Sequence, residues 1–577
     1  MSLELEAGRG ILDAAPLLHS GGRAWSLPDP AAEVTVRSGS VEARWPGRLR
    51  LRLRATPDGH RWRLRCGVVA EAPLRVDALG VRLRSAGATR ICVDGYHSWD
   101  WSGVRDTSVP GRGWWGAIWG APGGAAVAVA AARPPRLGAV ALEWDGEGAL
   151  DVLTAGEPEQ QSQRTAGPRS LGVELAAGER LAAEPVSAGP LDRRRAAGAG
   201  LPLPSPAGHR PGRRRVGWMS WNCLGPEVTA GDCADAAERL VPPGGVVLLD
   251  DGWMPWWGDW VERDGFDAPL ADLAATLRRR GRLLGVWLAP FLLDPRSTTA
   301  GLPGLPVLRD AGGEPVVDRR PASPQLVLDA STPAARRRLA ALGRRLGGMG
   351  VTVLKLDFLY AGALPAVRPP GWSGTAALRA GVAAVTRGFR STAPRGGAVW
   401  ACGAPAAPLV DLVDACRSGG DAVLNVPTRG AEPPPPPWFL FGEATVRAQT
   451  RNLAARSWLW GATLPPDADA VTLGGLAGRP AGDDATVHAW LELAVRSGGP
   501  LLVADAPGLA VAAARSRALR AARAAVAGRP ARPRRPLDPL VLDPAPGEDD
   551  DFLDWPEGLP AAWEDTPRRG RTTGQSW

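Results

Sequence analysis

Acidic side chains follow several apolar segments in the second half of the sequence. They are Asp250 and Asp251 after a run that begins near Val246, Asp357 after one from Val351, and Asp421 after one near Leu412. Two carboxyl groups can hydrolyse a glycosidic bond, one as nucleophile and one as acid/base, while other carboxylates bind hydroxyl groups. The alternative is that Asp-Asp-Gly only makes a turn and that Asp357 caps a helix. The joint occurrence of acids at successive segment ends favours the chemical role.

A single lysine, Lys355, stands two residues before Asp357. Almost all the basic charge of the chain is arginine, so a lysine kept inside an apolar segment indicates a place where a planar guanidinium cannot replace a compact ammonium. A structural ion pair is the simpler alternative. The position beside Asp357 favours a role in the site.

Tryptophan is unusually frequent, with 25 residues against 2 tyrosines and 7 phenylalanines. Indole rings can stack on the faces of sugars, although most tryptophans serve only as packing. Several lie in or after the apolar segments of the same part of the sequence, so that the acids stand amid them, namely Trp218, Trp221, Trp253, Trp257, Trp260 and Trp287. Their count raises a carbohydrate hypothesis only slightly, and their location beside the acids adds to it.

The acids need a scaffold that brings segment ends together. Apolar strands are expected to begin near Val216, Val246, Leu283, Val351, Ala398, Leu412, Trp458 and Leu501. Amphipathic helices are expected over 229–240, 270–280, 332–346, 376–390 and 484–496, with Thr229, Thr332 and Asp484 at cap positions. Eight such units over about 290 residues match a (β/α)8 barrel, whose active site lies at the carboxyl ends of the strands. An open doubly wound sheet is the alternative, but no Gly-x-Gly-x-x-Gly sequence opens the first unit.

The first part of the chain has a different pattern. Segments such as 33–37, 48–54 and 78–84 alternate apolar and polar residues between turn residues. This pattern predicts antiparallel sheets, here a β-sandwich. We therefore expect a multidomain chain, with a β-sandwich domain over 1–205, a (β/α)8 catalytic barrel over 206–528, and a short C-terminal tail or truncated β-domain over 529–577. The segment 201–208 is expected to be a linker, and the proline run 433–437 a surface loop.

Composition excludes several other classes. The 577 residues, roughly four times the usual size of a domain, allow two or three domains. Six cysteines without a Cys-x-x-Cys pair, and only five histidines, argue against a disulfide framework, a metal site or a bound cofactor. The net charge of +8 is spread as short arginine runs, which favours solvated faces over nucleic-acid binding. No long apolar run or signal-like amino terminus is present, so we expect no membrane association and a cytoplasmic location.

These motifs resemble glycoside hydrolase family 36, the α-galactosidases, and more loosely family 27. The barrel motifs that carry the resemblance are 217–222, 250–253, 258–260, 285–290, 355–357, 402–403 and 417–421, and the segment 94–99 is similar to one that the family carries before its barrel. Each motif alone is weak, whereas their common order is specific. The residues after the expected barrel are poor in strand pattern where the family usually has a full C-terminal β-domain, so we expect a departure from the family there.

The resemblance implies a retaining exo-glycosidase that releases α-galactose from small α-galactosides or oligosaccharides. Asp357 matches the nucleophile and Asp421 the acid/base, while Asp250 and Asp251 match the pair that binds O4 and O6 of galactose. Lys355 is similar to a lysine that contacts sugar hydroxyls, and Arg417 and Cys402 match positions near the 2-hydroxyl. Trp287 and Trp221 are expected as apolar walls, with Trp253 as a further substrate-binding residue.

Other interpretations stay open at this point. Asp414 is the reserve candidate for the acid/base, because the sequence after Asp421 does not align clearly with the family. The same covalent intermediate would also permit transfer to another sugar. A non-catalytic sugar-binding protein on the same fold is a third interpretation, which the presence of Lys355, Asp357 and Asp421 argues against. A homo-oligomer is compatible with the sequence.

Overall fold

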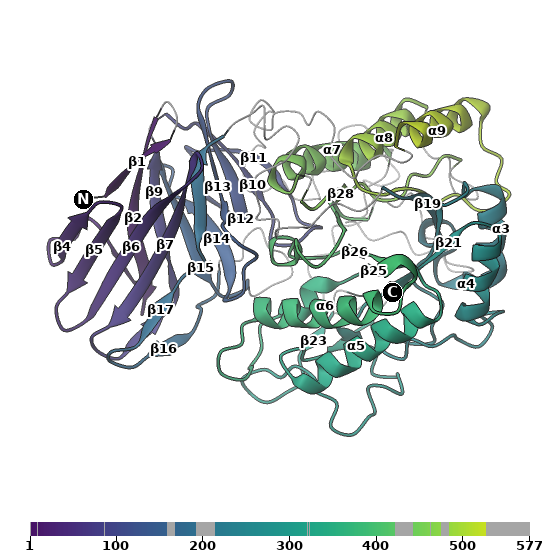
Figure 1. Cartoon of the computed structure of the whole chain (residues 1–577), viewed down its shortest axis with the longest axis horizontal. Coiled ribbons are helices and arrows are strands. Elements are labelled where there is room, and N and C mark those ends of the chain that lie inside the picture. Colours follow the sequence, from purple (N-terminus) through teal and green to yellow (C-terminus); the bar gives the residue numbers. More distant parts are fainter. Residues whose placement is uncertain are drawn as a thin grey trace, which may run out of the picture.

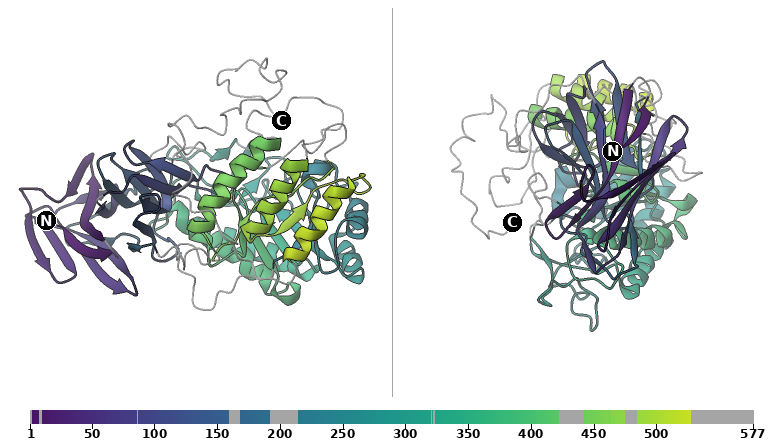
Figure 2. Two further views of the ribbon diagram at one scale, coloured as in Figure 1. Left: turned by 90° about the horizontal axis from the view of Figure 1, so that it is seen from above. Right: turned by 90° about the vertical axis from the view of Figure 1, so that its left-hand side faces the viewer.

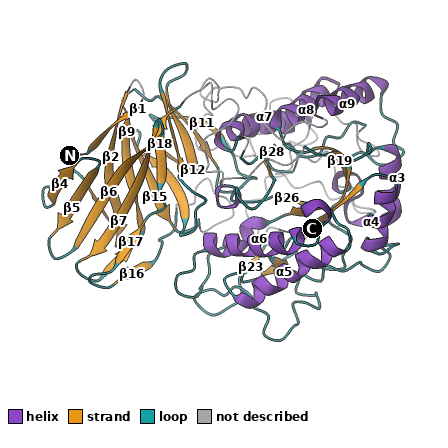
Figure 3. Ribbon diagram, in the orientation of Figure 1, coloured by secondary structure: helices purple, strands orange, loops and turns teal. Residues whose placement is uncertain are grey.

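The computed structural model describes residues 2–7, 10–85, 87–158, 168–191, 214–319, 321, 323–421, 442–461, 463–474 and 484–526. A strand-rich part built from the first third of the chain lies beside a part in which helices surround strands (Figures 1 and 3). The expected linker, the proline run 433–437 and the tail 529–577 lie outside the described residues.

The strand-rich part is one large antiparallel sheet of 16 strands with a separate pair, β8 and β16. Its strands are β1 Leu3–Ala7, β2 Gly10–Ser20, β3 Arg23–Ser26, β4 Glu33–Arg37, β5 Ser40–Trp45, β6 Leu49–Asp58, β7 Arg61–Ala70, β9 Ala78–Ser85, β10 Arg90–Asp94, β11 Gly103–Asp106, β12 Gly111–Gly120, β13 Ala126–Ala131, β14 Ala139–Trp144, β15 Ala149–Ala155, β17 Arg180–Ala182 and β18 Val186–Pro190; the pair is β8 Leu74–Val76 with β16 Val173–Leu175.

Alternation along the chain sets the two faces of this sheet. In β6 the leucines 49, 51 and 53 are buried and the arginines between them are exposed. Strand β2 contacts β6 and β7, and β9 contacts β7, although these strands stand far apart in the strand order, so the sheet folds over its own apolar face. The antiparallel β prediction for this part of the chain is confirmed.

The second part contains a nearly closed ring of eight parallel strands. They are β19 Val216–Met219, β20 Val246–Leu249, β21 Leu283–Leu288, β25 Val353–Leu356, β26 Ala398–Ala401, β27 Ala415–Arg417, β28 Pro466–Asp467 and β29 Leu501–Val503. Strand β29 pairs with β19, and Val471, just past β28, forms a parallel bridge with Val503. The ring is the predicted barrel.

Helices surround this ring, as Figure 2 shows from two further sides. They are α2 Trp221–Leu224, α3 Ala230–Arg239, α4 Leu270–Arg279, α5 Pro333–Gly348, α6 Gly374–Arg390, α7 Gly442–Leu459, α8 Asp484–Ser497 and α9 Ala513–Val526. Single 3-10 turns (Gly225–Glu227, Leu359–Ala363, Pro394–Gly396, Ala407–Leu409) and the short strands β22 Leu292–Leu293, β23 Val317–Asp318 and β24 Gln325–Val327 complete the connections. Among the described residues, no helix is long and apolar enough to cross a membrane.

The predicted caps of two helices are confirmed. Thr229 and Asp232 form a reciprocal capping box at α3, and Thr332 accepts a hydrogen bond from the backbone N–H of Ala335 at α5. Asp484 is the first residue of α8, one position inside the helix. There its charge still lies at the positive end of the helix dipole.

The predicted strand near Trp458 is wrong, because Trp458 lies in α7. Its apolar neighbours are the buried face of this helix, which packs against β10, β11 and β12 of the large sheet. The seventh barrel strand is instead β28, which has only two residues, Pro466 and Asp467. Such a strand has no apolar run from which the sequence could have indicated it.

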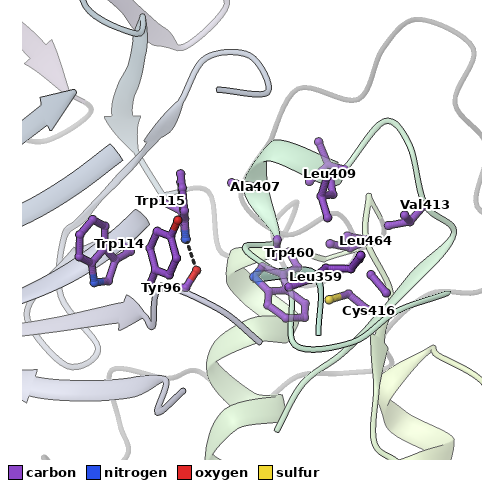
Figure 4. Packing of buried hydrophobic residues seen from close by; sticks show 14 of the residues in the cluster. Tyr96, Trp114, Trp115, Leu359, Ala407, Leu409, Val413, Cys416, Trp460 and Leu464 are labelled. Atoms are coloured by element: carbon purple, nitrogen blue, oxygen red, sulfur yellow. Dashed lines mark hydrogen bonds between the residues drawn. The ribbon is translucent and has the colours of Figure 1, made fainter. Parts of the chain in front are cut away.

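The two parts of the chain share a buried contact beside the barrel rim. The Arg456 side chain of α7, fully buried, donates to the Asp94 carboxylate (2.9 Å), to the Ser98 carbonyl (2.6 Å) and to the Ser418 carbonyl (2.8 Å). Figure 4 shows Trp114 and Trp115 of β12 and Tyr96 of the loop after β10 on one side, with apolar residues of the barrel part such as Leu409 on the other. This contact fixes the loop 95–102 against the end of β27.

Candidate active site

The carboxyl ends of the barrel strands bring together most of the predicted site residues. Because all eight strands run parallel, these ends form one rim. Asp250 and Asp251 directly follow β20, Asp357 directly follows β25, and Cys402 directly follows β26. Lys355 lies within β25, and Arg417 is the last residue of β27. Asp421 lies four residues farther along.

Asp357 is held through both of its carboxylate oxygens. Its Oδ2 accepts a hydrogen bond from Trp287 Nε1 (3.0 Å), and its Oδ1 accepts one from the backbone N–H of Phe358 (2.8 Å). The Lys355 ammonium lies 3.7 Å from Oδ2. These contacts fix the orientation of a buried carboxyl group, as a nucleophile that attacks one carbon atom requires.

Lys355 links Asp357 to the next strand. Its Nζ lies 2.7 Å from Asp250 Oδ2, and both side chains are buried. Burial by itself lowers the pKa of the Lys355 ammonium, but the carboxylates of Asp250 and Asp357 outweigh it and raise the pKa above its ordinary value. The residue therefore stays cationic between two anions.

Asp251 lies on the same rim in a more unfavourable environment for charge. Its Oδ1 accepts hydrogen bonds from Trp257 Nε1 (3.0 Å) and from the backbone N–H of Gly252 (2.8 Å). Burial, together with the charges of Asp250 and Asp357, raises the pKa of Asp251 from 3.8 to about 7. Near neutral pH, part of the population carries a proton here.

This raised pKa predicts an unusual dependence of stability on pH. From about pH 4 to pH 7 the folded chain keeps a proton on Asp251 that the unfolded chain has lost, so the free energy of unfolding falls as pH rises. Asp251→Asn removes this penalty. We expect the variant to gain up to about 3 kcal/mol over the wild type between pH 5 and pH 8.

Denaturant unfolding of both proteins at several pH values between 5 and 8 measures this gain. A constant offset caused by the substitution cancels, because only the change in the difference with pH is compared. A difference that stays the same across the range would contradict the raised pKa.

Arg417 organises the part of the rim at the end of β27, two strands away from Asp357. Its guanidinium contacts three carboxylates, Asp421 at 3.0 Å, Asp469 at 2.8 Å and Asp467 at 3.7 Å. The Asp421 side chain is 36% exposed, whereas those of Asp357 and Asp250 are 8% and 3% exposed. Asp421 is thus the carboxylate with the best access to solvent, as a group that exchanges protons with water requires.

Cys402 lies between these two parts of the rim. Burial and the nearby Asp357 carboxylate raise the pKa of its thiol well above the ordinary range, so the sulfur stays protonated. Its Sγ accepts a hydrogen bond from Trp99 Nε1 (3.2 Å). Trp99 belongs to the first part of the chain, and its ring lies edge-on to Phe358 with a centroid separation of 5.1 Å.

The sequence did not predict Trp99 as a site residue, although Trp99 lies in the segment 94–99, which resembles a segment of family 36. Trp99 reaches the barrel rim through the loop that Arg456 fixes. The first part of the chain therefore supplies one side of the site. Only a tertiary contact between residues more than 300 positions apart could show this.

The tryptophans divide into two groups. Trp287 contacts Asp357, and Trp221 is half-buried at the carboxyl end of β19. Trp253, predicted to bind substrate, is instead fully buried and donates its indole N–H to the Trp287 carbonyl (3.1 Å). We correct its assignment to a support behind Trp287. Trp257 faces the rim in its place, 5.2 Å from Trp287 between ring centroids.

The turn at Gly252 explains why Trp257, and not Trp253, lies at the rim. Gly252 has φ of 111°, and a Cβ added there would lie 2.5 Å from the Pro226 backbone. The turn directs Trp253 into the core and lets the chain return with Trp257 over Asp251. Sequence spacing alone could not distinguish the two tryptophans.

Asp414, the reserve candidate, lies at the other end of the barrel. It precedes β27, and its Oδ2 accepts hydrogen bonds from Arg390 (2.8 Å) and from the backbone N–H of Val399 (2.7 Å). Arg390 ends α6 and Val399 lies near the start of β26. Asp414 is therefore at the amino rim, where it joins a helix to two strands.

No group of three or more His, Cys, Asp or Glu side chains that could hold a metal ion occurs in the described part of the chain. The donors at the rim are carboxylates already engaged by Lys355 and Arg417. The arrangement consists of two carboxylates on the same rim, one after β25 and one after β27, with β26 between these strands and indole rings nearby. Such a pair can perform acid/base and nucleophilic chemistry on a sugar.

Comparisons with solved structures show that this fold is shared. No family model matches the sequence. The α-galactosidase TtGalA from Thermus thermophilus, solved with stachyose, is 20% identical with a TM-score of 0.61, over 90% of this chain and 99% of that one. The GH36 α-galactosidase AgaA from Geobacillus stearothermophilus is 14% identical with a TM-score of 0.56, over 90% of this chain and 74% of that one.

The α-galactosidase from Lactobacillus brevis is 12% identical, with a TM-score of 0.56 over 89% of this chain and 71% of that one. These matches include both the large sheet and the barrel, because they cover most of the chain. They confirm, at the level of the fold, the predicted resemblance to the family 36 α-galactosidases.

Proposed function

We propose that the protein is a retaining exo-glycosidase that releases terminal α-galactose from small α-galactosides through a covalent glycosyl-enzyme intermediate. The observation that carries the proposal is the Asp357 carboxylate, which is oriented through both oxygens and lies 3.7 Å from the Lys355 ammonium. The more exposed Asp421, which follows β27, supplies the second carboxyl group. The fold shared with α-galactosidases agrees with this assignment.

The reaction uses the two carboxyl groups in turn. Asp357 attacks the anomeric carbon while Asp421 gives its proton to the leaving oxygen, and the glycosidic bond breaks as the sugar–Asp357 ester forms. A water molecule then loses a proton to Asp421 and attacks the same carbon from the face that the leaving group vacated. Two inversions give galactose of retained configuration and restore both carboxyl groups.

The remaining rim residues form the proposed galactose site. Asp250 and Asp251 accept hydrogen bonds from O4 and O6, and Lys355 donates to a neighbouring hydroxyl group. Arg417 and Cys402 lie near the 2-hydroxyl. The apolar faces of the sugar meet the side chains of Trp287, Trp221, Trp257 and Trp99.

This site predicts strong selectivity for the configuration at C4. A site built around a buried hydroxyl group rejects an analogue that leaves its carboxylates unpaired, by about 10³-fold or more in kcat/KM. We expect nitrophenyl α-galactoside to be cleaved at least that much faster than nitrophenyl α-glucoside. A panel of nitrophenyl glycosides that includes the N-acetylgalactosaminide measures this.

Equal rates on the α-glucoside and the α-galactoside would overturn the galactose assignment while leaving a glycosidase. No hydrolysis of any glycoside in the panel would favour a non-catalytic sugar-binding protein on the same fold. The β-galactoside serves as the control for anomeric specificity.

We also propose that the protein works in the cytoplasm. All six cysteines of the chain are buried free thiols, as a reducing compartment allows. We propose that the protein uses no cofactor and binds no nucleic acid. The reaction above needs only the two carboxyl groups and water.

A further inference from the structure

Asp469 stands at the centre of a carboxylate cluster that the proposed reaction does not use. Its side chain is 2% exposed, and its Oδ1 lies 2.8 Å from the NH2 group of Arg417, which is equally buried. The NH1 group of the same guanidinium contacts Asp421 at 3.0 Å. One planar cation therefore joins Asp469 to the proposed proton donor.

The backbone conformation of the loop after β28 places the Asp469 side chain beside Arg417. Asp469 has φ of 70°, a left-handed conformation that residues other than glycine rarely adopt. Its backbone N–H donates to Asp467 Oδ1 (3.0 Å), and its own Oδ1 accepts from the N–H of Ala470 (2.7 Å). Backbone strain of this kind is concentrated at functional sites.

The same loop is tied to β27, the strand that carries Arg417. Both the backbone N–H and the hydroxyl group of Ser418 donate to the Asp467 carbonyl, each at 2.9 Å. The Asp467 carboxylate lies 3.7 Å from Arg417 Nε. The two strand ends thus hold the guanidinium from two sides, and Asp421 occupies its third edge.

We propose that Asp469 is a positioning residue for the proton donor. It fixes Arg417 and offsets part of the guanidinium charge that faces Asp421. This inference rests on the proposed function, in which Asp421 is the acid/base.

The charges around Asp421 support this role. Arg417 of β27 contacts it directly, Asp467 and Asp469 lie across that guanidinium, and Cys402 after β26 is close enough to interact with its charge. Asp357, which follows β25, and Lys355 within β25 also interact electrostatically with Cys402. The Arg417 cation and the carboxylates on its other edges therefore act on the Asp421 carboxyl group with charges of opposite sign.

Asp469→Asn tests the inference. Asparagine has nearly the same shape and tolerates a left-handed backbone, but it leaves the Arg417 charge less compensated. We expect the basic limb of the kcat/KM profile to move down by about one pH unit with an alkyl α-galactoside, whose leaving group needs a proton. With an activated aryl galactoside, which needs no proton to leave, we expect no such movement.

The position of the limb does not depend on how much enzyme is folded, so loss of stability cannot imitate the result. Asp505→Asn is the matched control. This buried carboxylate follows β29 and accepts hydrogen bonds from the N–H groups of Leu473 and Gly474. It has no described contact with Arg417, and its replacement is expected to leave the limb where it is.

Asp467→Asn is the second variant, with an expected shift in the same direction but smaller, because its carboxylate lies farther from the guanidinium. It carries the test if Asp469→Asn does not fold. Unmoved limbs in both variants, or an equal shift with the aryl substrate, would overturn the inference while leaving the glycosidase intact. A wild-type protein without glycosidase activity would overturn the proposed function and this inference with it.

Discussion

Replacement of Asp357 with asparagine is expected to reduce kcat/KM by about 10⁴-fold or more, because an amide cannot form the glycosyl ester. The fold should persist. Asparagine fills the same volume, and its oxygen can still accept the hydrogen bond from Trp287 Nε1. Lys355 keeps Asp250 as its closer partner at 2.7 Å.

The measurement is hydrolysis of nitrophenyl α-galactoside by wild type and variant, with circular dichroism to show that both are folded. Asp414→Asn is the control, since this carboxylate lies at the opposite rim and contacts Arg390. We expect it to lose stability and keep turnover. A wild-type rate in Asp357→Asn would reject Asp357 as the nucleophile.

Replacement of Asp421 with alanine is expected to slow hydrolysis by an amount that depends on the leaving group of the substrate. Loss of the acid should slow an alkyl galactoside by about 10² to 10⁴-fold, because its leaving oxygen needs a proton. An activated aryl galactoside should still form the intermediate, which then accumulates for lack of a base. Both kcat and KM for the aryl substrate should therefore fall.

Added azide should rescue this variant, because it is a nucleophile that needs no base. It attacks the face that water would use, so the product is a galactosyl azide of retained configuration. Product analysis by NMR measures the configuration. Rescue by azide in Asp414→Ala, and none in Asp421→Ala, would transfer the acid/base role to Asp414.

The barrel and most of its rim were predictable from the sequence because each signal was local. The apolar runs before Asp250 and before Asp357 indicate both that a strand is present and where it ends. The sequence of β28, a proline and an aspartate, indicates neither the strand nor its end. Asp469, which follows it, was therefore invisible as a neighbour of Arg417.

Two other features depend on contacts between distant residues. Trp99 reaches the rim because Arg456 holds its loop across the boundary between the large sheet and the barrel. Trp253 is buried, and Trp257 lies at the rim instead, because the backbone turns at Gly252. Composition and periodicity contain no information on either, whereas the resemblance of segment 94–99 to the family gave the one available indication.

The central claim is that Asp357 forms the covalent bond to galactose, and the most direct test is the mass of the labelled peptide. Asp421→Ala is mixed with an activated aryl α-galactoside, quenched in acid, digested and analysed by mass spectrometry. We predict that the peptide containing Asp357 gains the mass of one galactosyl residue and that Asp357→Asn in the same background abolishes the gain. A galactosyl group found on another residue, or a burst of aryl release without any labelled peptide, would contradict the account.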